Sequence, residues 1–151
     1  MNDAEFTRAF ERGEIRNQDF HHASHLRVAW VYLGESTTLD QAIEKMCTTI
    51  RRFATSAGYP EKYHQTITVF WMRVLAALAR LDRGADLERV LQENPQLLEK
   101  NLSLEYFSRE TLSSDRARLG WVEPDLKPLP NATAIRSSST TSNSSHRLVC
   151  R

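Results

Sequence analysis

Histidines are the residues of this chain whose type and spacing most favour metal chemistry. The 151 residues include five histidines, and His22 and His25 lie three positions apart in a segment with helical periodicity. On a helix this spacing places both imidazole rings on one side. His64 opens a second such segment. Because imidazole is a common ligand of zinc, iron and copper, we predict that His22, His25 and His64 hold one transition metal ion (Zn, Fe or Cu).

All three histidines continue the apolar stripes of their predicted helices. One stripe comprises His22, His25, Leu26, Ala29 and Leu33, and the other comprises His64, Ile67, Thr68, Trp71, Leu75 and Leu78. A buried polar group without a partner costs about 1–3 kcal/mol. These rings therefore need either a shared ion or separate hydrogen-bond partners in the core. His21 lies off the stripe, so we expect it to be exposed.

A small pocket is expected around these histidines. Its predicted members, lining the pocket or supporting the metal ligands, are Tyr63, Thr68, Arg27, Trp30 and Trp71. The Thr68 hydroxyl can bond the His64 ring or a backbone carbonyl of the preceding turn. Arg27 can anchor an anionic substrate or extend toward solvent. The two tryptophans can line a pocket or build core.

These residues support two hypotheses about function. The first is a metal-binding helical bundle that performs hydrolytic or oxidative chemistry on a small molecule, with catalytic residues that the sequence does not identify. The second is a non-catalytic helical module that binds a small ligand or a protein and whose buried histidines are structural. The oligomeric state is left open in both.

Composition argues against several other classes of protein. The net charge of +1 gives no electrostatic case for binding nucleic acid or an anionic membrane. The longest apolar stretch, Val69–Leu81, contains arginines and is shorter than the roughly 20 residues of a membrane span. The acidic start lacks the pattern of a signal peptide, and Cys47 and Cys150 form no thiolate motif. We therefore expect a cytoplasmic protein.

The apolar periodicity predicts an all-α fold, a compact bundle of about five to six helices. The expected helices span residues 3–12, about 20–33, 38–57, 60–82 and 85–93, with further helical segments in 97–107 and 113–119. Residues 1–130 should form a single domain. Residues 131–151 are rich in Ser and Thr and poor in apolar side chains, so we expect a disordered tail.

Two sequence patterns resemble those of a family of small bacterial all-helical proteins. The first is the His-x-x-His-Leu-Arg-x-Ala-Trp core within Phe20–Leu33, and the second is Lys62–Thr68 together with Trp71. The segments Ser113–Arg118 and Trp121–Pro130 are similar to the carboxy-terminal signature of that family. The resemblance covers about residues 18–130 and implies no defined reaction. The family often has Glu where this chain has Gln65.

Overall fold

The structure is a computed structural model that describes residues 1–79 and 86–130. All regular structure in these residues is helical, so the predicted all-α class is confirmed. The α-helices are α1 (Asp3–Glu11), α2 (His22–Glu35), α3 (Leu39–Ser56), α4 (Gln65–Ala79), α5 (Leu87–Glu93), α6 (Arg109–Leu112) and α7 (Asp115–Leu119). Short 3-10 helices are η1 (Asn17–Asp19), η2 (Pro60–Lys62), η3 (Pro95–Leu98) and η4 (Lys100–Glu105). The predicted tail, 131–151, lies outside the described residues.

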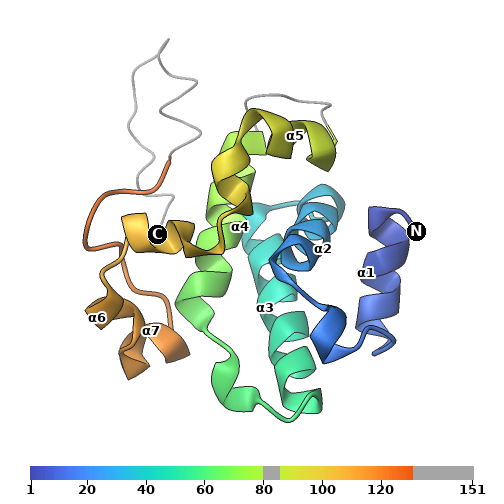
Figure 1. Cartoon of the computed structure of the whole chain (residues 1–151), viewed down its shortest axis with the longest axis horizontal. Coiled ribbons are helices and arrows are strands. Elements are labelled where there is room, and N and C mark those ends of the chain that lie inside the picture. Colours follow the sequence, from blue (N-terminus) through green and yellow to red (C-terminus); the bar gives the residue numbers. More distant parts are fainter. Residues whose placement is uncertain (80–85, 131–151) are drawn as a thin grey trace.

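Helices α2, α3 and α4 pack on one another and form the body of the bundle. Helix α1 covers α2 on one side, and α6 and α7 lie beside α4 on the other (Figure 1). No helix in the described part of the chain has the length and apolar character needed to cross a membrane.

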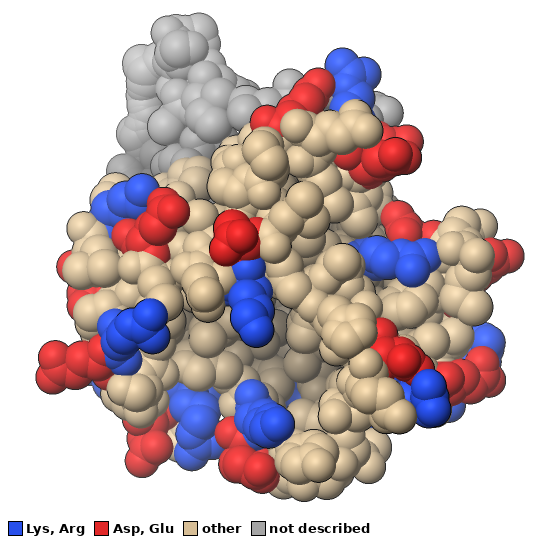
Figure 2. Space-filling view, in the orientation of Figure 1, with Lys and Arg blue, Asp and Glu red and all other residues tan. Residues whose placement is uncertain are grey.

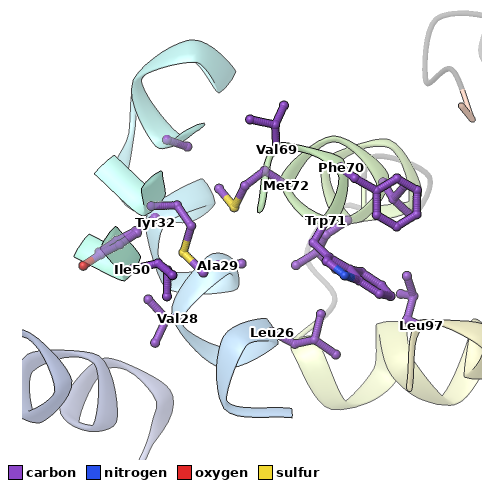
Figure 3. Close-up of a cluster of buried hydrophobic side chains, with 14 of the residues drawn as sticks. Leu26, Val28, Ala29, Tyr32, Ile50, Val69, Phe70, Trp71, Met72 and Leu97 are labelled. Carbon is purple, nitrogen blue, oxygen red and sulfur yellow. The ribbon is translucent and has the colours of Figure 1, made fainter. Parts of the chain in front are cut away.

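The core is centred on α4, which is apolar around most of its circumference. Phe70, Met72 and Leu75 of this helix are fully buried, as expected for a helix surrounded by others. Figure 3 shows Trp71 reaching toward Leu26 of α2 and Leu97 of η3. The start of α2, the first half of α4 and η3 therefore share one part of the core.

The fourth predicted helix begins later than the sequence pattern indicated. Gly58 ends α3 with a φ of 89°, which is readily adopted by glycine. Pro60 then starts the short η2 instead of α4, and Tyr63 is extended, with a ψ of 136°. Helix α4 starts at Gln65. As a result His64 precedes α4, where the prediction had placed it inside the helix.

Two other boundaries also differ from the prediction. Residues 17–19 form η1, and α2 begins at His22, after the predicted start at about residue 20. The segment 97–107, expected to be helical, contains the 3-10 helices η3 and η4 after Pro95.

Residues 120–130, the C-terminal strap, return over α4 without regular structure. The buried Thr66 hydroxyl donates to the Gly120 carbonyl at 2.6 Å and accepts from the Val122 N–H at 3.2 Å. Trp121 lies edge-on to Phe107, with a centroid distance of 6.0 Å. These contacts fix the strap, and with it α6 and α7, against the first half of α4.

Candidate functional site

His64 connects the start of α4 to the end of α6. Its Nε2–H donates to the Leu112 carbonyl at 2.8 Å. Its Nδ1 accepts the backbone N–H of Ile67 at 3.1 Å, so the imidazole occupies the position of a helix N-cap. Both ring nitrogens therefore have hydrogen-bond partners within the chain, in the neutral form that carries its hydrogen on Nε2.

His22 connects the first turn of α2 to η3. Its Nε2–H donates to the Leu97 carbonyl at 2.8 Å, and its ring lies 4.5 Å from Trp71, centroid to centroid. Burial lowers the pKa of His22 below its ordinary value, against the opposing effect of the bond to Leu97. The imidazole therefore stays neutral at pH 7 and acts as a hydrogen-bond donor.

His25 packs among aromatic rings one turn later on α2. Its ring lies 4.6 Å from Phe20, which stacks on Phe10 at 4.3 Å and contacts Phe53 at 4.9 Å. The ring Nδ1 faces the His21 carbonyl at 3.3 Å. Burial lowers the pKa of His25 to about 4. The side chain of His21 is exposed, as predicted.

The described residues contain no group of three or more His, Cys, Asp or Glu side chains placed to share a metal ion. His22 bonds toward η3 and His64 toward α6, two separate segments of the chain. The metal ion expected at His22, His25 and His64 stays a prediction, without a ligand cluster to support it here.

The residues predicted to form a pocket each make their own separate contacts. The Thr68 hydroxyl donates to the His64 carbonyl at 2.8 Å, which is the backbone alternative for this residue. Arg27 pairs with Asp3 at 2.7 Å and donates to the Met1 carbonyl at 2.9 Å, so its charge is directed at α1. Trp71 is buried, and Trp30 is partly buried against the core.

A polar cluster between α3 and α4 was not anticipated from the sequence. Arg51 donates from Nη2 to the Gln65 Oε1 at 3.2 Å, and its guanidinium carbon lies 4.8 Å from the centroid of the Tyr63 ring. The Tyr63 hydroxyl donates to the same Gln65 oxygen at 2.5 Å. Arg51 and Cys47 are four positions apart on α3, a spacing that places them on the same side of a helix.

Cys47 lies against this cluster but is a poor nucleophile. The thiol is free and buried, and burial raises its pKa despite the opposing effect of the Tyr63 hydroxyl. Burial also raises the pKa of Tyr63. Both groups are therefore neutral at pH 7, and the guanidinium of Arg51 is the only formal charge among Cys47, Arg51, Tyr63 and Gln65.

Protein-family models, curated proteins and solved structures give no match to this chain. The resemblance to a family of small bacterial proteins therefore stays a prediction.

Proposed function

We propose that this chain is a non-catalytic helical module that binds a small ligand and whose buried histidines are structural. The observation that carries this proposal is the hydrogen bonding of His64, which uses both ring nitrogens within the chain. A metal ion at either nitrogen would have to displace a backbone partner and leave it unpaired, at a cost of about 1–3 kcal/mol.

The other two histidines support the same proposal. His22 donates to the carbonyl of Leu97, 75 positions away in the sequence, and so fastens η3 to the start of α2. The ring of His25 packs against Phe20, the residue that follows η1. Burial lowers its pKa and keeps it neutral at pH 7. Each ring thus performs a packing or hydrogen-bonding task that needs no ion.

The net charge of the chain disfavours two other kinds of partner. With a net charge of +1, the chain lacks the strong basic character of a nucleic-acid or membrane-binding protein. We place the protein in the cytoplasm and assign it a small-molecule ligand in preference to either of those partners.

Metal analysis of protein purified without a histidine tag tests the proposal. The protein is incubated separately with zinc, iron(II) under anaerobic conditions and copper, and is then freed of unbound ions. We expect retention far below one ion per chain, and equal retention in His25→Ala and in the exposed control His21→Ala.

The opposite pattern would support the metal hypothesis. Retention of about one ion per chain that is lost in His25→Ala and kept in His21→Ala would mean that the buried histidines bind metal, and the proposed structural role would be wrong.

A further inference from the structure

Two neighbouring side chains hold the guanidinium of Arg51, which has no carboxylate partner among the described residues. Its guanidinium is held over the Tyr63 ring at 4.8 Å and donates to the Gln65 oxygen at 3.2 Å. A guanidinium has five N–H donors, and the Gln65 bond occupies one of them. Arg51 can therefore present further donors to a ligand while its orientation is already fixed.

Gln65 is oriented by the same contacts. Its Oε1 accepts from both Tyr63 and Arg51, which directs the amide Nε2 away from these two donors. That nitrogen carries two N–H groups. Gln65 is also the first residue of α4, a helix of 15 residues, where the helix dipole favours negative charge. The Gln65 amide and the Arg51 guanidinium both carry further N–H donors, and the positive end of the α4 dipole favours negative charge near them.

The cluster lies where α3, the residue that follows η2 and the start of α4 meet. Helix α3 contacts η2 and α4, and α2 contacts both α3 and α4. Figure 2 shows a hollow near the middle of one face of the molecule, with both basic and acidic side chains around it. Arg51 is exposed, whereas Tyr63 is 8% exposed. The cation thus faces solvent from a buried aromatic support.

We propose that Arg51, Gln65 and Tyr63 form the recognition site for the carboxylate of a small organic ligand. A planar carboxylate matches the fork of a guanidinium, with two parallel N–H···O bonds. A single arginine with an amide neighbour suits one negative charge better than the two of a phosphate monoester. This inference rests on the proposed ligand-binding function and specifies its ligand class.

Titration with benzoate, followed by side-chain and backbone NMR, tests this site. We expect saturable shifts of the Arg51 Nε–H and the Gln65 side-chain amide. Arg51→Gln should weaken benzoate binding about tenfold or more, because it removes a charge-assisted bidentate contact. The matched control is Arg52→Gln, which removes the same charge from the neighbouring exposed position of α3 and should change affinity less than about twofold.

Three results would overturn the proposal. They are the absence of saturable shifts at millimolar benzoate, equal weakening in Arg51→Gln and Arg52→Gln, and binding of inorganic phosphate as tight as that of benzoate. Circular dichroism of each variant shows whether it is folded, and Tyr63→Phe provides a second test, since loss of the hydroxyl should weaken benzoate binding without removing charge. Benzoate binding together with a stoichiometric metal ion would uphold this site and refute the structural histidines.

Discussion

The His64 imidazole makes two hydrogen bonds, and two substitutions separate their contributions to stability. His64→Ala removes the acceptor for the Ile67 N–H, an N-cap bond typically worth about 1 kcal/mol. It also removes the donor to the Leu112 carbonyl, a bond worth about 1 kcal/mol more. We therefore expect His64→Ala to lower the free energy of unfolding by about 2 kcal/mol.

His64→Asn should lower the free energy of unfolding by about half as much as His64→Ala. Asparagine is among the best N-cap residues, so the bond to the Ile67 N–H can be kept, but its side chain is too short to follow the ring to Leu112. The expected loss is about 1 kcal/mol.

Urea unfolding of the wild type and both variants, with and without a chelator, measures these differences. The free energy of unfolding should decrease from the wild type to His64→Asn and further to His64→Ala, with the same differences whether or not the chelator is present. A loss that occurs only when metal is present, or equal losses for Asn and Ala, would refute the reasoning from the two hydrogen bonds.

The remaining predictions concern acid sensitivity, the strap and the α1–α2–α3 contacts. His25 has a folded pKa of about 4, below the unfolded value of about 6.5. Between these values the unfolded chain binds more protons, so the free energy of unfolding should fall as the pH drops from about 6.5 to 4. His25→Gln should make the free energy of unfolding less dependent on pH in this range, and the exposed control His21→Gln should not. Thr66→Val should cost about 2 kcal/mol, because the fully buried hydroxyl makes two bonds to the strap, and unchanged amide exchange at Val122 would contradict this. Tyr32→Phe should cost about 1–3 kcal/mol in thermal or urea unfolding, because the buried hydroxyl bonds Glu11 and Thr49; a change within error would mean that this connection between helices contributes little.

The helical architecture followed from local pattern, because apolar periodicity and caps act over a few residues. Asn2 and Thr38 cap α1 and α3 through capping boxes that the sequence contains. The break before α4 was harder to predict, because Pro60 is compatible with the first turn of either a long helix or η2. His22 and His25 are partly buried, each with one polar contact through a ring nitrogen.

The partners of the histidines could not be predicted in the same way. His64 bonds a carbonyl 48 positions away and His22 one 75 positions away, and such contacts depend on how distant segments pack. The sequence showed that the rings needed partners, but a backbone carbonyl leaves no side-chain signature. The contacts of Arg51 were missed for a related reason, because its neighbours Tyr63 and Gln65 come from beyond the turn that follows α3.

The hydrogen-bonding state of the His64 imidazole is the most direct test of the structural role of the histidines. Long-range ¹H–¹⁵N NMR of the side chain distinguishes a protonated ring nitrogen from an unprotonated or metal-bound one. The account predicts hydrogen on Nε2 and none on Nδ1 at pH 7, with nitrogen shifts that do not change when zinc or a chelator is added. A zinc-dependent shift of either His64 nitrogen, reversed by the chelator, would contradict it.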